Sequence, residues 1–376
     1  MNANAFFPEI HGNFGFGCMR LPMIENDVDT EQFKKMVDDF LCAGFNYFDT
    51  AHGYIGGKSE TAIAECLSAR HDRGKFLLTN KLSQSFFKSG SDIRPLFQAQ
   101  LDACGVSYFD FYLMHAQNRR NFEHFKACHA YETAFELKKE GLVRHVGISF
   151  HDNAETLDRI LSEYPQVEVV QIQFNYLDYL DTGVDSKRVY EVCKKHGKPV
   201  IVMEPVKGGH LVKLPPEAQS VFDGLNGGSN ASYALRFAAG FPQVAMTLSG
   251  MSDRAQMEDN LKTMAEFKPL DAREQDAVDA VSRFIRMQHA IPCTACRYCV
   301  DMNACPAGIL IPDLFAAYNA KISFRDWNSR NYYQRALVNG HGKPSDCLSC
   351  GACESACPQG LKIRELLQTV AKEFEG

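Results

Sequence analysis

The first 285 residues alternate short apolar runs with longer amphipathic stretches, and this pattern constrains the fold more than any other feature of the chain. Strands that alternate with helices are typical of a parallel sheet. Several of the amphipathic stretches end at glycine, which commonly terminates a helix. Seven apolar runs predict strands, at 45–50, 76–81, 109–115, 144–149, 169–175, 199–204 and 243–249.

About eight strand–helix units in this length predict an α/β fold of the closed (β/α)8 type, a TIM barrel, over residues 1–285. We expect the missing strand, seventh in chain order, within 206–228, although that segment reads as a loop. A doubly wound open sheet is the alternative. It is less favoured because no G-x-G-x-x-G sequence follows the first predicted strand.

Eight of the 14 cysteines fall between residues 293 and 357. The second group has the spacing C-x2-C-x2-C-x3-C-P, which is typical of a [4Fe–4S] cluster, and the first group keeps the first two of these spacings. Zinc sites usually combine two C-x2-C pairs, and disulfides are rare in reducing compartments. The sequence therefore predicts iron–sulfur ligands at Cys293, Cys296, Cys299, Cys305, Cys347, Cys350, Cys353 and Cys357.

This tail resembles the two-cluster ferredoxin module of bacteria, with an insert between its halves. In such modules the fourth cysteine of each group binds the cluster of the other group. The resemblance implies that Cys357 completes the first cluster and that Cys305 completes the second. We expect a ferredoxin-like domain over 286–376, with two [4Fe–4S] clusters and an inserted helical segment at about 306–346.

The stretch 271–290, which leads into the first cysteine, predicts a helix with one buried apolar face. A helix without a flexible linker after it should hold the ferredoxin-like domain against the barrel, on the side of the active-site mouth. The apolar positions are Ala277, Val278, Val281, Phe284 and Ile285.

The overall composition narrows the choice of partner and compartment. A net charge of −6 argues against a nucleic-acid partner, because binding phosphates requires a basic surface. No apolar run approaches the length of a membrane span, so we expect no membrane association. The first residues lack the basic and apolar regions of a signal peptide. We therefore expect a cytoplasmic protein.

Polar side chains stand at the ends of the first three predicted strands, where a TIM barrel forms its active site. They are Asp49, with Tyr54 five residues later, then Lys81 and His115. A tyrosine hydroxyl has a pKa of about 10, and a nearby ammonium group lowers it. Tyr54 could then act as a general acid, with Asp49 holding Lys81 in its charged form. Taken singly, His115 is equally typical of a buried polar residue, and Asp49 of a helix cap.

The segments FDTAHGYIGGKSE, LLTNK and FYLMH, which contain these residues, resemble three signature segments of the aldo-keto reductase superfamily. The resemblance spans about residues 12–265, and a subgroup of the superfamily ends in a ferredoxin-like module. It implies a catalytic tetrad of Asp49, Tyr54, Lys81 and His115 that acts on a small carbonyl or alcohol substrate. His52 and His151 are two further imidazoles at these strand ends, and His151 is a candidate substrate contact.

The same resemblance implies NADP or NAD as the hydride carrier, with the nicotinamide amide on Ser149 and Gln171. The pyrophosphate would lie near 204–209 and at the start of the last barrel helix, where free N–H groups attract anions. Arg254 is the only cation near the expected 2′-phosphate, which leaves NADPH and NADH both open. The candidate nucleotide contacts are Gly17, Ser149, Gln171, Glu204, Lys207, Gly250, Ser252, Gln256 and Asn260.

The two halves leave three functions open. The first is an NAD(P)H-dependent carbonyl reductase whose clusters are structural or sense redox state. The second is a ferredoxin-linked oxidoreductase that passes single electrons through the clusters, with a redox protein as partner. Because nicotinamide does not readily exchange single electrons, this second function requires a flavin or a radical step. FMN is then a candidate cofactor, since barrels can bind its phosphate at their last two strands. The third is a non-enzymatic redox sensor, which the tetrad disfavours.

Overall fold

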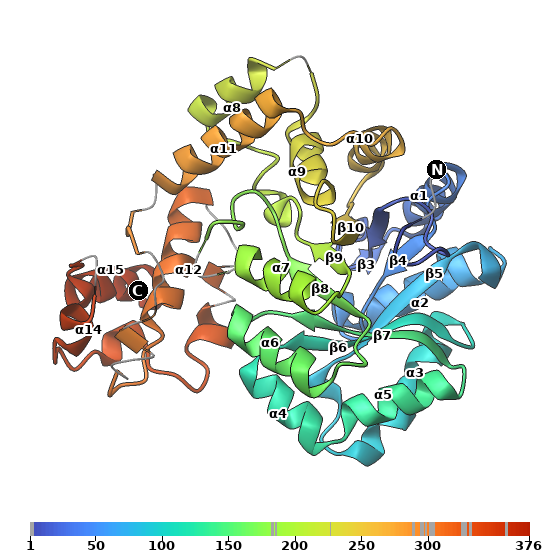
Figure 1. Ribbon diagram of the computed structural model, residues 1–376, viewed down its shortest axis with the longest axis horizontal. Helices are drawn as coiled ribbons and strands as arrows, with labels where there is room; N and C mark the ends of the chain where they lie inside the picture. The colour runs from blue at the N-terminus through green and yellow to red at the C-terminus, as the bar shows by residue number, and fades with distance from the viewer. Residues whose placement is uncertain are drawn as a thin grey trace.

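The computed structural model describes residues 4–376 apart from 182–183, 185, 226, 288–289, 294–296, 298, 301–304, 325–328, 331–332 and 358–359. Eight parallel strands within these ranges close into a barrel, which confirms the predicted TIM barrel (Figure 1). In spatial order they are β1 (Phe14–Gly17), β10 (Val244–Gly250), β9 (Val200–Met203), β8 (Val169–Gln173), β7 (Val143–Phe150), β6 (Phe109–Gln117), β5 (Leu77–Leu82) and β4 (Tyr47–Asp49).

Alternate residues of each strand point into the barrel, because successive side chains of a strand face opposite sides. The interior is closed by an apolar cluster that includes Tyr47, Leu77, Phe111, Val169 and Ile201. Closer to the carboxyl ends of the strands, the residues on the same inward side are polar. The polar layer contains Asp49, Lys81, His115, Ser149 and Gln171.

The prediction of a strand within 206–228 is wrong. That segment holds the 3₁₀ turn η6 (Lys207–Gly209) and the helix α8 (Pro216–Asp223), and the eighth strand is β1, before the first predicted one. A Cβ on Gly15 would lie 2.7 Å from Cδ2 of Leu248 and 2.9 Å from Sδ of Met246, so this strand needs glycine there. Two glycines in four residues weaken the strand signal in the sequence.

Helices cover the outside of the barrel (Figure 1). Several begin where their sequence provides a cap: Asp29, Asn153 and Asp253 each accept a hydrogen bond from a backbone N–H of the first turn. A short hairpin of β2 (Met23–Ile24) and β3 (Asp27–Val28) follows β1. The helices are α1 (Thr30–Cys42), α2 (Lys58–Ile63), α3 (Ile93–Cys104), α4 (Arg119–Ala127), α5 (Ala130–Lys139), α6 (Ala154–Glu163), α7 (Ser186–Lys195), α8, α9 (Asn230–Ala239) and α10 (Arg254–Ala265).

Helix α11 (Ala272–Met287) confirms the helix predicted over 271–290. It packs on α8 and α9, and Glu274 forms an ion pair with Arg236 of α9 at 2.5 Å. Its predicted apolar face belongs to the main hydrophobic cluster of the barrel, with Phe284 partly buried and Ala277, Val278, Val281 and Ile285 buried. The helix is therefore part of the barrel's outer layer.

The residues after α11 form a smaller module with a separate hydrophobic cluster, shown in orange and red at one side of the barrel in Figure 1. Its helices are α12 (Ile311–Phe324), α14 (Ala352–Ser355) and α15 (Ile363–Glu375). The ring of Tyr333 stacks on Phe374 of α15 with centroids 4.7 Å apart. Aromatic residues of the insert therefore pack inside the module.

The module approaches the barrel at the start of α4. A Cβ on Gly340 would lie 4.0 Å from Nη1 of Arg120, which is the second residue of α4 and lies three residues after the end of β6. This contact lies on the side of the barrel where the strands end and where His115 is found. Among the described residues, no helix is both long enough and apolar enough to cross a membrane.

Candidate active site and cysteine-rich module

Three of the four predicted catalytic side chains are joined by hydrogen bonds at the carboxyl end of the barrel. Nζ of Lys81, on β5, lies 2.5 Å from Oδ1 of Asp49, on β4. The same nitrogen donates to the hydroxyl of Tyr54 at 3.3 Å and to the backbone oxygen of Thr50 at 2.8 Å. Lys81 and Asp49 are buried, and Tyr54 begins the 3₁₀ turn η1 (Tyr54–Gly57).

Burial is the largest influence on the pKa values of Tyr54 and Lys81. Burial raises the pKa of Tyr54, and the Lys81 ammonium offsets the rise only in part. The expectation that Lys81 brings this pKa below its ordinary value is therefore wrong, and the Tyr54 hydroxyl keeps its proton at neutral pH. Burial opposes the charge of Lys81, but Asp49 and Tyr54 together outweigh burial and raise the pKa of Lys81.

His115 completes the group from β6. Its ring meets the Tyr54 ring edge to face, with centroids 5.9 Å apart, and its Nδ1 lies 2.5 Å from Oγ of Ser83. Burial, followed by the charge of Lys81, lowers the pKa of His115 well below its usual value. The imidazole is therefore neutral at neutral pH and carries one N–H group.

The two further imidazoles differ in their surroundings. His151 directly follows the last residue of β7, two positions after Ser149, and is exposed. The surrounding protein and the charge of Lys81 lower the pKa of His151 to about 4. His52 is instead held by its Nδ1, 2.7 Å from Oε2 of the buried Glu60, in the wall of the site beside Phe86.

Ser149 and Gln171 are neighbours in the register of β7 and β8. Oγ of Ser149 accepts the backbone N–H of Ala116 at 2.7 Å, and Nε2 of Gln171 donates to Oδ2 of Asp49 at 3.1 Å. Within the described residues, the Ser149 hydroxyl proton and Oε1 of Gln171 have no other partner. One donor and one acceptor side by side match the chemistry of a carboxamide.

The loop after β9 carries Glu204 and Lys207, both with positive φ. Nζ of Lys207 lies 2.6 Å from Oδ1 of the buried Asp178, whose other oxygen accepts the amide groups of Gln173 and Asn175. Burial opposes ionisation of Asp178, but Lys207 and these amides outweigh it and lower the pKa of Asp178. Lys207 is therefore fixed by a carboxylate that the sequence analysis did not identify.

Arg20 is a second residue that the sequence analysis missed. It follows β1, and its guanidinium group would lie 3.2 Å from a Cβ on Gly208, while its own Cβ would lie 3.3 Å from one on Gly250. The exposed Arg20 side chain makes no ion pair with any described residue, and its backbone oxygen accepts the hydroxyl of Ser252 at 3.1 Å. It thus places a positive charge between the loops that follow β9 and β10.

The remaining candidate nucleotide contacts surround this position. Gly17 and Gly250 are paired in register, and a Cβ on Gly17 would lie 3.4 Å from the backbone nitrogen of Gly250. Oε1 of Gln256 accepts the N–H of Ser252 at 3.0 Å. The buried Asn260 donates to Oγ of Ser249 at 3.1 Å, so its amide is already engaged inside the protein.

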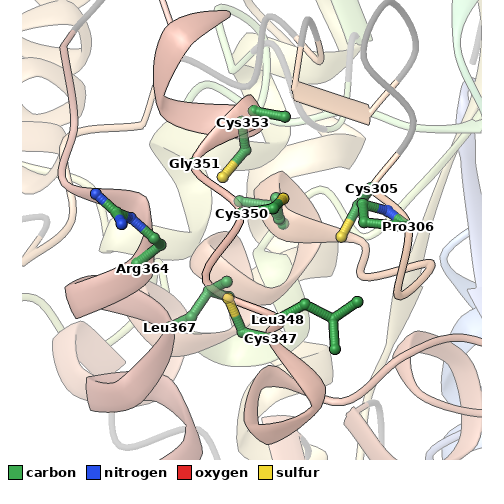
Figure 2. Close-up of a pocket in the computed structure, with 11 residues that line it drawn as sticks. Cys305, Pro306, Cys347, Leu348, Cys350, Gly351, Cys353, Arg364 and Leu367 are labelled. Carbon is green, nitrogen blue, oxygen red and sulfur yellow. The ribbon is translucent and has the colours of Figure 1, made fainter.

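Four predicted cluster ligands line one pocket of the module. Cys347, Cys350 and Cys353 come from one segment and Cys305 from another, with Arg364 and Leu367 of α15 beside them (Figure 2). Among the described residues, no three or more His, Cys, Asp or Glu side chains converge on one point as ligands of a single metal ion would. The four sulfur atoms surround a space instead of converging on a point, which suits a cluster with several irons better than one tetrahedral zinc ion.

The other predicted ligand group is described only in part, because Cys296 lies outside the described residues. Cys299 is buried in the hydrophobic cluster of the module, and Cys293 and Cys357 are partly buried against the same cluster. These three cysteines therefore lie in or against the interior of the module, as do Cys305, Cys347 and Cys353.

Comparison with known proteins assigns both parts of the chain. Residues 13–283 match the model of the aldo/keto reductase family, and residues 292–361 match a 4Fe-4S dicluster domain. L-galactose dehydrogenase of Arabidopsis thaliana is 24% identical over 71% of this chain and 89% of its own. The NADH-specific methylglyoxal reductase of Escherichia coli is 25% identical over 50% of this chain and 61% of its own.

Solved structures show the same barrel. An aldo-keto reductase of Bacillus halodurans, AKR11C1 in its holo form, has 24% identity and a TM-score of 0.56, covering 72% of this chain and 92% of its own. An aldo/keto reductase of Klebsiella pneumoniae in complex with NADP and acetate has 18% identity and a TM-score of 0.58, covering 72% and 91%. The chain therefore belongs to the aldo/keto reductase family and carries a C-terminal 4Fe-4S dicluster domain.

Proposed function

We propose that this protein reduces a small carbonyl compound with NADPH or NADH and holds two [4Fe–4S] clusters in its C-terminal module, in the cytoplasm. One observation carries the proposal. The Tyr54 hydroxyl is hydrogen-bonded to a lysine that is itself paired with a buried aspartate, at the carboxyl end of an aldo/keto reductase barrel. The small carbonyl compound is the partner, and neither a nucleic acid nor a membrane is required.

The chain's own residues have distinct tasks in this reaction. A bound nicotinamide nucleotide supplies the hydride to the carbonyl carbon and is itself oxidised. Tyr54 keeps its proton because burial raises its pKa, and it transfers that proton to the carbonyl oxygen as the C=O double bond is reduced. Lys81, held in its charged form by Asp49, stabilises the tyrosinate that remains until solvent restores the proton.

Other residues bind the nucleotide. The free hydroxyl proton of Ser149 and the free oxygen of Gln171 fit the carboxamide of nicotinamide. Arg20, between Gly208 and Gly250, fits the pyrophosphate, because these glycines let the phosphates approach the backbone closely. The carboxylate of Asp178 neutralises Lys207, so Arg20 is the better candidate for this charge.

The side chains of the module also fit iron–sulfur clusters. Cys305, Cys347, Cys350 and Cys353 line one pocket, and Cys293, Cys296, Cys299 and Cys357 remain for a second cluster. Cys350 and Leu348, two residues before it, are exposed, which favours a second candidate function. Electrons from a redox protein partner would enter here and reach FMN or the substrate in the barrel.

The absorption spectrum of anaerobically purified protein, with NADPH or NADH and then methylglyoxal as probe, separates these functions. Carbonyl reduction predicts loss of nucleotide absorbance only when methylglyoxal is present, with the cluster absorbance unchanged. Flavin bands, or clusters bleached by nucleotide alone, would support the ferredoxin-linked function instead. Nucleotide binding with no turnover of methylglyoxal or of a panel of other aldehydes and ketones would leave the redox sensor as the better account.

A further inference from the structure

The strand that carries His115 is distorted at that residue. The pairing of β6 with β7 shifts register between Met114 and Gln117, and Ala116 has a φ of 52°. Such bulges occur next to active sites, where they redirect a side chain. The backbone of Ala116 is held on both sides, because its N–H donates to Ser149 and its oxygen accepts the side-chain amide of Asn121 at 2.7 Å. The main chain therefore sets the direction of the imidazole.

Ser83 holds the far side of the same ring. It follows the end of β5 and is buried, and its Oγ lies 2.5 Å from Nδ1 of His115. A hydroxyl can donate or accept a hydrogen bond, so the direction follows from counting partners. If Nδ1 carried the proton, the buried Ser83 proton would have no acceptor among the described residues, and an unsatisfied buried donor is destabilising. If Ser83 donates, both groups are satisfied.

We propose that Ser83 is a positioning residue, which donates its hydroxyl proton to Nδ1 of His115 and so fixes the imidazole as the tautomer protonated on Nε2. This inference deepens the proposed carbonyl reduction and rests on it. With Nδ1 occupied, Nε2–H is the one hydrogen-bond donor of the neutral ring. His115 therefore acts beside Tyr54 as a donor to the carbonyl oxygen and does not accept a proton from the substrate.

The inference explains a departure from simple packing. A small apolar residue could fill the buried position after β5, yet the residue there is Ser83, whose hydroxyl lies at hydrogen-bond distance from the His115 ring. Without that bond the imidazole could exchange its proton between both nitrogens, or rotate out of its edge-to-face contact with Tyr54. Either change would remove the donor without altering the Tyr54, Lys81 and Asp49 group.

The test compares Ser83→Ala with Ser83→Thr, which keeps the hydroxyl, and with Ser91→Ala, a change at an exposed serine eight residues away. The first readout is the ¹⁵N NMR spectrum of histidine-labelled holoprotein without substrate, with the His115 signals identified through a His115→Gln variant. Nε2 of His115 should be protonated in the wild type and in Ser83→Thr. In Ser83→Ala the two tautomers should mix.

The second readout is steady-state reduction of methylglyoxal. Ser83→Ala should lower kcat about tenfold, the loss expected for one hydrogen bond, with an unchanged Kd for NADPH and NADH. Ser83→Thr should recover most of kcat, and Ser91→Ala should match the wild type.

Protonation of Nδ1 in the wild type, or the same single tautomer and kcat in Ser83→Ala, would overturn the inference. Should the wild type reduce no carbonyl, the proposed function fails while the NMR comparison still decides whether Ser83 fixes the ring. Should Ser83→Ala not fold, the wild-type tautomer alone decides.

Discussion

Lys81 and Asp49 form an ion pair inside the barrel, with 2.5 Å between Nζ and Oδ1 and with both side chains almost fully excluded from solvent. Asp49→Asn would leave a buried ammonium group without its counter-charge. We expect a loss of about 3–5 kcal/mol in the free energy of unfolding, because an unpaired buried charge is costly. Denaturant titration measures it, with Asp39→Asn as control. Asp39 pairs with Arg254 at the surface, and its loss should cost less than about 1 kcal/mol. Equal losses in the two variants would contradict the prediction.

Tyr54→Phe should abolish carbonyl reduction while nucleotide binding persists. The change removes the proton donor and keeps the ring that contacts His115. Loss of general acid catalysis typically costs a factor of about 10²–10⁴ in rate. Turnover of methylglyoxal and the Kd of the nucleotide, measured on the same preparation, check this. Wild-type turnover in Tyr54→Phe would exclude this hydroxyl as the acid.

Paired cysteine substitutions should reveal which cysteines share a cluster. The holoprotein should contain about eight iron atoms, and Cys305→Ser should retain about four. Adding Cys347→Ser to Cys305→Ser should cause no further loss, because both line one pocket. Adding Cys293→Ser instead should remove the remaining iron, and the exposed Cys42 serves as control. If the Cys305–Cys293 double variant kept about four irons, Cys305 would belong to the first cluster.

His145 should make stability depend on pH. Burial opposes its charge, but the carboxylates of Glu168 and Glu9, at 2.9 and 2.6 Å, outweigh burial and raise the pKa of His145. A raised pKa stabilises the fold fully below the unfolded value of about 6.5, and this stabilisation is lost as the pH rises through the folded value. His145→Gln should therefore flatten the fall in unfolding free energy above about pH 6.5, by at most about 1.4 kcal/mol per pH unit. Parallel curves for the two proteins would contradict this assignment.

Gly15→Ala should destabilise the barrel. The added methyl group would meet Leu248 and Met246 at less than the usual contact distance, and overpacking of this kind costs about 1–3 kcal/mol. Gly74→Ala is the matched control, because no heavy atom lies within 4 Å of its added Cβ and its φ is not positive. Thermal unfolding of both variants, compared with the wild type, gives the difference. A larger loss at Gly74 than at Gly15 would contradict the packing argument.

Most of the barrel could be predicted because seven of its strands are continuous apolar runs. Such a run is visible in the sequence without knowing which residues it contacts in the fold. The strand β1 was not predicted because Gly15 is required by its close contacts with Leu248 and Met246, which lie more than two hundred positions away in the sequence. Arg20 was not identified as a candidate site residue for the same reason, because it comes to lie between Gly208 and Gly250 only when the barrel closes. The pKa of Tyr54 was predicted in the wrong direction because burial, which a sequence does not display, outweighs the neighbouring charge.

The main hydrophobic cluster of the barrel and the hydrophobic cluster of the C-terminal module are separate, and helix α11 belongs to the first of them. During synthesis every residue of the barrel, including the helix that completes its outer layer, therefore leaves the ribosome before the first cysteine ligand does. Domains generally fold in this order, as units from the N-terminus. The barrel can close before iron is delivered. A shortage of iron would then leave folded barrels whose C-terminal modules lack their clusters, instead of unfolded chains.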